Sequence, residues 1–198
     1  MNKYTSDYFS KKASEENHPT RSYYKLEEID RKFHIIKRND TILDLGSSLG
    51  GWTEYSSKKI NDGKILSIDL IALDIKVASE KNVYYMQKNI NDIDIIDCII
   101  KNGWTYFDVI ISDLSPSTTG IKSSDQYQSF ELSKRALDMA MGILKEKGNF
   151  VCKIFESEYV KEYTDESKKY FSEVKNFRPK STRQGSKEMY IIGKNRLR

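Results

Sequence analysis

Short apolar runs rich in β-branched residues alternate along the chain with segments whose apolar residues recur at helical spacing. The runs expected to be strands are Thr41–Leu45, Ile65–Leu70, Val83–Gln87, Asp108–Ser112, Asn149–Ile154, Val174–Arg178 and Met189–Lys194. The segments expected to be helices are Arg21–Phe33, Trp52–Ile60, Ile93–Lys101, Tyr127–Lys145 and Tyr159–Phe171. Strands of this kind, alternating with helices, form a largely parallel sheet that is covered on both faces. The sequence therefore predicts an α/β fold with a doubly wound, seven-stranded sheet and a terminal antiparallel strand.

The length of 198 residues and the hydrophobic content of 38% suit a single domain over residues 1–198. Within it, we expect residues 1–40 to form a basic N-terminal arm and a helix that carries Lys25. No apolar run approaches the ~18 residues of a membrane span, and the N-terminus lacks the apolar segment of a signal peptide. The two cysteines and two histidines provide no metal-ligand spacing. We therefore expect a soluble intracellular monomer without a metal, in a compartment that the sequence does not specify.

The net charge of +4 is unevenly distributed along the chain. Residues 1–40 carry a net charge of +2, residues 41–120 of −4 and residues 121–198 of +6. An acidic middle between basic ends predicts two ligands of different charge, one that tolerates acidic surroundings and one that is polyanionic.

The first expected strand leads into a glycine-rich loop that precedes a helix. The sequence is Asp44-Leu45-Gly46-Ser47-Ser48-Leu49-Gly50-Gly51-Trp52. A dinucleotide fingerprint requires a glycine where Ser48 stands, because the backbone must approach a pyrophosphate there. Asp44 would instead suit a positive group, and S-adenosylmethionine carries an amino group and a sulfonium but no phosphate. We therefore expect Asp44 and the three glycines of this loop to bind S-adenosylmethionine rather than NAD.

Two polar residues that follow the next strands extend the expected cofactor site. Asp69 ends the second strand, where a carboxylate can accept hydrogen bonds from both ribose hydroxyls of an adenosine. Asn89 lies in the polar turn Lys88–Asp92 after the third strand, and this turn is expected to contact the edge of the adenine. Each would be an ordinary turn residue by itself. With the glycine loop at a matching strand end, cofactor binding is the better interpretation.

Charged residues also mark the ends of the fourth and fifth strands. Asp113 follows Asp108–Ser112 directly, and Lys153 interrupts an otherwise apolar run. Considered singly, Asp113 is typical of a turn cap and Lys153 of a lysine that reaches water along its own stem. Together they bring a carboxylate and an amine to adjacent strand ends, where doubly wound sheets bind their ligands.

Five ordered motifs cover nearly the whole chain. They are Arg21-Ser22-Tyr23-Tyr24-Lys25-Leu26, Asp44-Leu45-Gly46 with Gly50-Gly51-Trp52, Ser112-Asp113-Leu114-Ser115-Pro116, Val151-Cys152-Lys153 and Ser186-Lys187-Glu188. In this order they resemble the FtsJ/RrmJ family of RNA ribose 2′-O-methyltransferases. The chain departs from the family pattern at Ser48-Leu49, where a small residue and a proline are usual, and at Asn89, where an acidic residue is usual.

The resemblance implies a Rossmann-like class I methyltransferase fold with S-adenosylmethionine as methyl donor and no metal. It implies a catalytic tetrad of Lys25, Asp113, Lys153 and Glu188, and cofactor contacts at Gly50, Trp52, Asp69 and Asp113. Such a site must align the 2′-hydroxyl with the methyl group and remove or disperse one proton. We expect Lys153 to act either as the base or as a stabiliser of the alkoxide. Lys25 would orient the hydroxyl, and the two carboxylates would position both lysines.

The basic ends of the chain are expected to hold RNA through phosphate contacts and base stacking. The residues concerned are the cluster Lys175–Arg198 together with Lys3, Lys11, Lys12, Arg21, Tyr4, Tyr8, Tyr23 and Tyr24. In its compact length, the chain resembles the family branch that methylates large-subunit ribosomal RNA. The expected substrate is therefore RNA within a ribosomal particle. The alternatives are a methyltransferase of the tRNA anticodon loop, a non-catalytic RNA-binding ribosome-assembly factor and, least favoured, an NAD-dependent oxidoreductase.

Overall fold

The computed structural model describes residues 5–198, with side chains from Tyr8 onward, so Lys3 and Tyr4 of the expected RNA-binding arm lie outside the described residues. The strands are β1 (Thr41–Leu45), β2 (Lys64–Asp69), β3 (Val83–Gln87), β4 (Phe107–Ser112), β5 (Leu144–Phe155), β6 (Phe171–Phe177) and β7 (Glu188–Arg196). The helices are α1 (Thr5–Glu15), α2 (Ser22–Phe33), α3 (Gly51–Lys59), α4 (Ile75–Ala78), α5 (Ile95–Lys101), α6 (Lys122–Ile143) and α7 (Tyr159–Ser167). Within these residues, no helix is long and apolar enough to cross a membrane.

The strands form one sheet in the order β3-β2-β1-β4-β5-β7-β6. The pairings β1–β2, β2–β3, β1–β4 and β4–β5 are parallel, whereas β7 is antiparallel to both of its neighbours. The chain proceeds outward from β1 to β3 and then returns to β4 on the other side of β1. The switch point of the sheet therefore lies between β1 and β4. The predicted doubly wound, seven-stranded sheet is confirmed, and its antiparallel strand β7 lies between β5 and β6.

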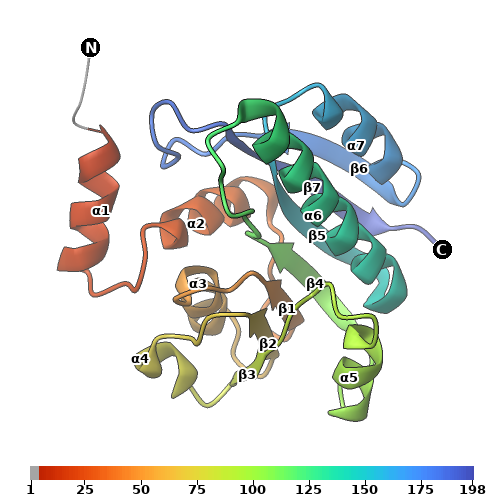
Figure 1. Cartoon of the computed structure of the whole chain (residues 1–198). Helices are drawn as coiled ribbons and strands as arrows, with labels where there is room; N and C mark the ends of the chain where they lie inside the picture. Colours follow the sequence, from red (N-terminus) through yellow and green to blue (C-terminus); the bar gives the residue numbers. More distant parts are fainter. Residues whose placement is uncertain (1–4) are drawn as a thin grey trace.

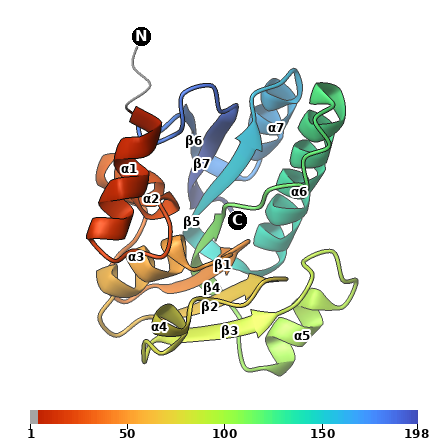
Figure 2. The same cartoon turned by 60° about the vertical axis from the view of Figure 1, so that its left-hand side comes forward.

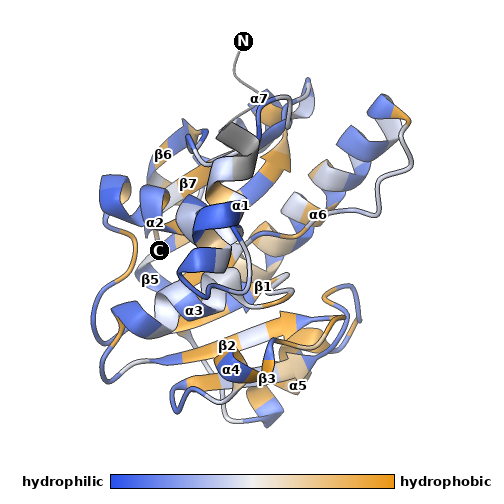
Figure 3. Ribbon diagram, turned by 90° about the vertical axis from the view of Figure 1, so that its left-hand side faces the viewer, coloured by the Kyte–Doolittle hydropathy of each residue, from blue (hydrophilic) through white to orange (hydrophobic). Residues whose placement is uncertain are grey.

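Helices cover both faces of the sheet (Figure 1). One apolar core joins the sheet to α5, α6 and α7, and the other joins it to α2 and α3. Side chains of β5 alternate between the two: Phe150 and Cys152 belong to the first core and Val151 to the second. Lys153 therefore projects toward the face that carries α2. Figure 3 shows the hydrophobic residues concentrated in the strands, while the outer surfaces of the helices are largely hydrophilic.

Two predicted helices end earlier than their sequence patterns indicated. The helix predicted to reach Lys145 ends at Ile143, because Leu144 is already paired with Phe107 in the sheet. The helix predicted to reach Phe171 ends at Ser167. Phe171 instead begins β6, with its ring stacked on Phe150 at 5.8 Å between centroids. In both places a buried partner on a neighbouring strand outweighs a local preference for helix.

The described part of the N-terminal arm begins with helix α1. α1 packs against α2 (Figure 2): the ring centroids of Phe9 and Tyr24 lie 5.5 Å apart. Tyr24 is buried, and its hydroxyl donates to Glu16 at 2.7 Å. Tyr23 stacks on His18 at 3.7 Å between centroids. Both tyrosines hold the N-terminal segment against the domain. For Tyr24, expected to stack on RNA bases, burial shows that the prediction was wrong, whereas Tyr23 is half-buried and its expected stacking stays a prediction.

Candidate active site

The four charged residues of the expected tetrad come from separate segments and line one cavity of about 570 Å³, called here the tetrad cavity. Lys153 Nζ lies 3.3 Å from Asp113 Oδ1 and donates to the Asp113 main-chain oxygen at 2.7 Å. Lys25 Nζ donates to Glu188 Oε2 at 2.8 Å. Both lysines are buried, with exposed fractions of 6% for Lys25 and 5% for Lys153. The site thus consists of two lysine–carboxylate pairs that face one space.

Strand register explains why these residues meet. Asp113 follows β4 directly, and the last β4 residue, Ser112, is paired with Cys152 of β5, which precedes Lys153. Across the antiparallel pairing of β5 with β7, Lys153 lies opposite Tyr190. Glu188 is the first residue of β7 and so reaches the same edge of the sheet.

Helix α2 supplies Lys25 from above this edge, and its C-terminal end is fixed by Asp30. Asp30 Oδ1 accepts from the main-chain N–H groups of Ile35 and Ile36, at 2.9 Å each. The other oxygen accepts from the Tyr55 hydroxyl at 2.8 Å, which ties α2 to α3. The buried carboxylate therefore locks the helix that positions Lys25.

Tyr190 is a member of the site that the sequence analysis missed. It is fully buried, and its hydroxyl donates to Asp113 Oδ1 at 2.9 Å. Burial by itself would raise the pKa of Asp113. The charges of Lys153 and Lys25, together with the Tyr190 hydrogen bond, outweigh burial and hold that pKa below its ordinary value. Asp113 is thus kept as a carboxylate. The signal available in the sequence was the position of Tyr190, one strand period after Glu188.

The glycine-rich loop between β1 and α3 borders a second cavity, of about 360 Å³, called here the glycine-loop cavity. Gly46 has a φ of +76°, and a Cβ added there would lie 2.9 Å from the main chain of Leu114. A side chain at this position would therefore both strain the loop and push it against the segment after β4. The two cavities share Gly46, Ser48, Asp113 and Ser115, so they meet at the switch point.

The expected cofactor residues divide into those that line a cavity and those that lie behind one. Gly46, Asp69, Asn89 and Asp113 line the glycine-loop cavity, and Trp52 lines the tetrad cavity. Gly50 and Gly51 line neither. Gly50 turns the chain into α3 with a φ of +103°, and Gly51 allows Thr20 and Ser22 to pack closely. Their role in the structure is to shape the loop.

Asp44 also lies behind the cavities, fully buried beneath the glycine-rich loop. Its Oδ2 accepts from the Thr53 hydroxyl at 2.6 Å, whereas its Oδ1 is buried without a hydrogen-bond partner. Burial raises the pKa of Asp44 to about 7, although the Thr53 hydrogen bond acts in the opposite direction. The negative charges of Asp113 and Asp69 raise it further. When Asp44 is ionised, its negative charge would attract a positive group bound near the loop.

The walls of the glycine-loop cavity suit a nucleoside. One carboxylate oxygen of Asp69 accepts from the Ser48 N–H at 2.6 Å and the other from the Ile71 N–H at 2.9 Å. Each oxygen can accept a second hydrogen bond, so both can receive a ribose hydroxyl. Ile68, Leu70 and Ile90 add apolar surface to the same cavity. The carboxylate, the apolar walls and the close glycine turn fit the adenosine part of S-adenosylmethionine.

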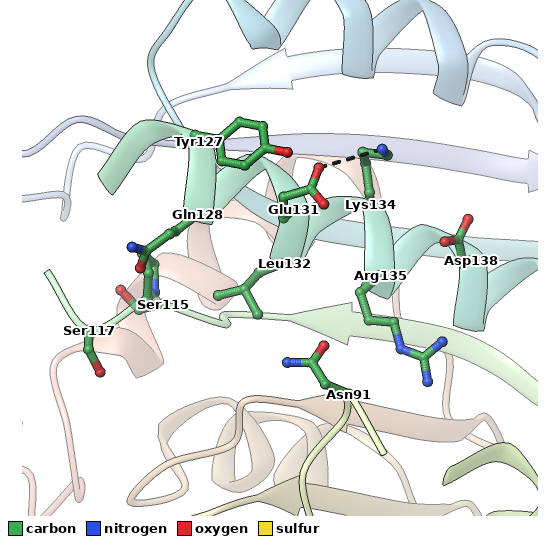
Figure 4. A pocket seen from close by; sticks show the side chains of 11 residues that line it. Asn91, Ser115, Ser117, Tyr127, Gln128, Glu131, Leu132, Lys134, Arg135 and Asp138 are labelled. Carbon is green, nitrogen blue, oxygen red and sulfur yellow. Dashed lines mark ion pairs between the residues drawn. The ribbon is translucent and has the colours of Figure 1, made fainter. Parts of the chain in front are cut away.

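A third cavity, of about 610 Å³, lies against α6 beside the glycine-loop cavity (Figure 4). Figure 4 shows Arg135 extending from α6 toward the loop that carries Asn91. Arg135 donates to the main-chain oxygens of Ile90 at 2.8 Å and Asp92 at 3.1 Å. This arginine therefore ties the Lys88–Asp92 turn, which includes Asn89, to α6. No local pattern in the sequence indicates this contact.

Basic side chains lie at the mouth of the tetrad cavity. Arg21 and Arg183 line it, together with Gln184 and Ser186 of the β6–β7 loop. This loop, residues 179–187, belongs to the basic C-terminal cluster noted in the sequence. Within residues 5–198, no group of three or more His, Cys, Asp or Glu side chains is arranged to hold a metal ion.

Comparison with known proteins gives consistent matches over nearly the whole chain. The family model described as FtsJ-like methyltransferase matches residues 19–196. The Ribosomal RNA large subunit methyltransferase E of Bdellovibrio bacteriovorus is 41% identical over 94% of this chain and 95% of its own length. The protein of the same name from Treponema denticola is 39% identical, with coverages of 97% and 96%.

Solved structures share the fold of this chain. A crystal structure described as a ribosomal RNA methyltransferase from Plasmodium falciparum superimposes with a TM-score of 0.80 and 27% identity, covering 91% of this chain and 99% of the other. A chain of the fibrillarin/Nop5p complex gives a TM-score of 0.64 at 17% identity, with coverages of 86% and 80%, and shares the fold alone.

Proposed function

Since this chain belongs to the FtsJ-like methyltransferase family, we propose that it transfers a methyl group from S-adenosylmethionine to a ribose 2′-hydroxyl of large-subunit ribosomal RNA. One observation carries the proposal: four charged side chains from separate segments line a cavity that shares four residues with the glycine-loop cavity. A methyl donor in one cavity and a hydroxyl in the other would meet at the shared wall. The names of the two bacterial relatives support ribosomal RNA as the substrate.

In this proposal, the glycine-loop cavity holds the cofactor. Asp69 would accept hydrogen bonds from the ribose hydroxyls, and Asn89 with the apolar walls would contact the adenine. Asp113, which lines both cavities, would face the positive end of the donor. When bound, S-adenosylmethionine supplies a methyl group that is already activated by its sulfonium. The protein must then provide only alignment and the removal or dispersal of one proton.

The buried lysines would act on the hydroxyl. Lys153 directs two of the three N–H donors of an ammonium at Asp113, which leaves one for the substrate oxygen. As an ammonium, Lys153 would direct this third N–H at the oxygen and stabilise the developing alkoxide. As a neutral amine with both N–H groups on Asp113, it would instead direct its lone pair at the hydroxyl and accept the proton. Lys25, held by Glu188, would orient the hydroxyl from the opposite side. Tyr190 would keep Asp113 ionised, so that Lys153 stays in place throughout the step.

The basic mouth of the tetrad cavity would bind the RNA backbone. Arg183 and Lys187 belong to the β6–β7 loop, and Glu188 is the sole acidic residue from Lys175 to Arg198. Phosphate neutralisation by such side chains gives salt-dependent affinity. We propose that the protein acts as a monomer on a ribosomal particle.

The test is transfer of labelled methyl from S-adenosylmethionine to purified large ribosomal subunits, to free ribosomal RNA and to tRNA, followed by mapping of the modified nucleotide. We expect label in large-subunit RNA at a ribose that becomes resistant to alkaline cleavage. Label confined to tRNA would reject the proposed substrate in favour of the anticodon-loop alternative. RNA binding without transfer to any of the three would indicate a non-catalytic assembly factor.

A further inference from the structure

Helix α2 binds the first part of the β6–β7 loop through Glu28. Glu28 Oε2 accepts from the main-chain N–H of Lys180 at 2.7 Å, and Oε1 accepts from that of Ser181 at 2.8 Å. Arg21 Nη2 donates to the main-chain oxygen of Ser181 at 2.7 Å. Ser181 is buried, with an exposed fraction of 1%. Three main-chain groups of two consecutive loop residues are thus held by Arg21, which precedes α2, and by Glu28 in the middle of this helix.

The same helix also holds the far end of the loop. Lys25 pairs with Glu188, where the loop enters β7. Lys25 and Glu28 are one helical turn apart and therefore lie on the same face of α2. Between these two anchor points, the loop carries Arg183, which lines the mouth of the tetrad cavity. Fixing both ends of the loop fixes where this cation stands relative to Lys25.

We propose that Glu28 is a positioning residue: its carboxylate latches the β6–β7 loop to α2 and thereby sets the RNA-binding side chains over the tetrad cavity. The inference rests on the proposed function for its RNA part, whereas the latch itself is a property of the fold. Glu28 lines neither the tetrad cavity nor the glycine-loop cavity. It would act through the loop and not on the reacting atoms.

A carboxylate is the group that this position requires. Two adjacent N–H donors need two acceptor oxygens, and a carboxylate provides both. In Glu28→Gln, the amide retains one oxygen and turns its NH₂ group toward the second N–H, so that one of the two hydrogen bonds is lost and a donor faces a donor. The substitution keeps the size of the side chain and its place on the helix.

Removing the charge of Glu28 distinguishes an electrostatic role from a latch, because the two roles predict opposite changes in the affinity for RNA. If Glu28 acted only as a negative charge near RNA, its removal would strengthen RNA binding. If it acts as a latch, the loosened loop must be ordered on binding, and affinity falls. Glu27→Gln is the matched control. Glu27 lies on the same helix and pairs with Arg31, so it carries the same charge without holding the loop.

The experiment compares the full-length protein with Glu28→Gln and Glu27→Gln. Amide hydrogen exchange and limited trypsin cleavage over residues 179–187 report the loop, and titrations report affinity for RNA and for S-adenosylmethionine. We expect faster exchange and cleavage in Glu28→Gln alone, together with a rise of about tenfold in the KM for RNA. The kcat at saturating RNA and the affinity for S-adenosylmethionine should stay within about twofold of the unsubstituted protein, because Glu28 lines neither cavity and bound RNA orders the loop again.

Failure of the latch and failure of the proposed function can be told apart. Unchanged loop exchange in Glu28→Gln would overturn the latch whatever the activity, and so would RNA binding that tightens as much as in Glu27→Gln. If the unsubstituted protein transfers no methyl group to RNA, the proposed function fails, while loop exchange still decides whether Glu28 holds the loop.

Discussion

Asp44 provides a quantitative test of the electrostatics beneath the glycine-rich loop. It is fully buried, has one oxygen without a partner, and has a pKa raised from 3.8 to about 7. Because the pKa in the folded protein exceeds that in the unfolded chain, folding favours the protonated form. The contribution of Asp44 to the stability of the fold is fully present below its pKa in the unfolded chain. It is lost as the pH rises through its pKa in the folded protein. Within the pH window between these two pKa values, the free energy of unfolding falls by about 1.4 kcal/mol per pH unit, for a total of about 4 kcal/mol.

The perturbation is Asp44→Asn, which cannot ionise and keeps an oxygen for the Thr53 hydroxyl. Near the acid end of the window, the variant should differ little from the unsubstituted protein. By about pH 8, it should be more stable by an amount approaching the same ~4 kcal/mol. The assay is urea unfolding without cofactor at intervals between about pH 4.5 and 8.5, with the difference between the two proteins plotted against pH.

A second variant tests the assigned cause. The Thr53 hydrogen bond lowers the pKa of Asp44, so Thr53→Val should move the window upward in pH. A stability difference between Asp44→Asn and the unsubstituted protein that stays constant with pH would refute the reasoning. Asp44 would then be ionised throughout, in spite of its burial.

Three further predictions concern the cavities and the loops around them. Arg135→Met releases the Lys88–Asp92 turn, so affinity for S-adenosylmethionine measured by calorimetry should fall about tenfold while affinity for RNA is unchanged. Gly46→Ala places a side chain at positive φ against Leu114, so chemical denaturation should show a loss of about 2–4 kcal/mol; a loss below about 0.5 kcal/mol would contradict the packing. Arg183→Ala should weaken RNA binding and reduce the slope of log affinity against log salt by about 0.7–0.9, whereas an unchanged slope would remove Arg183 from the phosphate contacts.

Local sequence patterns were sufficient for the parts of the fold that short-range periodicity determines. The expected strands at Thr41–Leu45 and Val83–Gln87 have the observed bounds, because each is an apolar run ended by polar turn residues. The parallel direction of most strands also followed from their alternation with helices. Because β4 and β5 are parallel neighbours, Asp113 and Lys153 lie at neighbouring strand ends, as predicted.

Contacts between residues far apart in the sequence could not be obtained in this way. Tyr190 reaches Asp113 across 77 residues and Glu28 reaches Lys180 across 152, and each relies on strand register or loop path. Tyr24 was expected at an RNA surface because its sequence neighbours are basic. Its ring is buried instead, because α1 covers it. Aromatic residues between charges are compatible with both outcomes, and only the packing of α1 decides.

The central claim is that the methyl donor binds in the glycine-loop cavity while the tetrad cavity performs the transfer. The measurement that tests it most directly compares Lys153→Met with the unsubstituted protein in two assays on the same sample, S-adenosylmethionine affinity and methyl transfer to large-subunit RNA. Lys153 lines the tetrad cavity but not the glycine-loop cavity. The account predicts that transfer falls by at least about 100-fold while cofactor affinity changes by less than about threefold. A Lys153→Met protein that still transfers methyl groups at a comparable rate would contradict it.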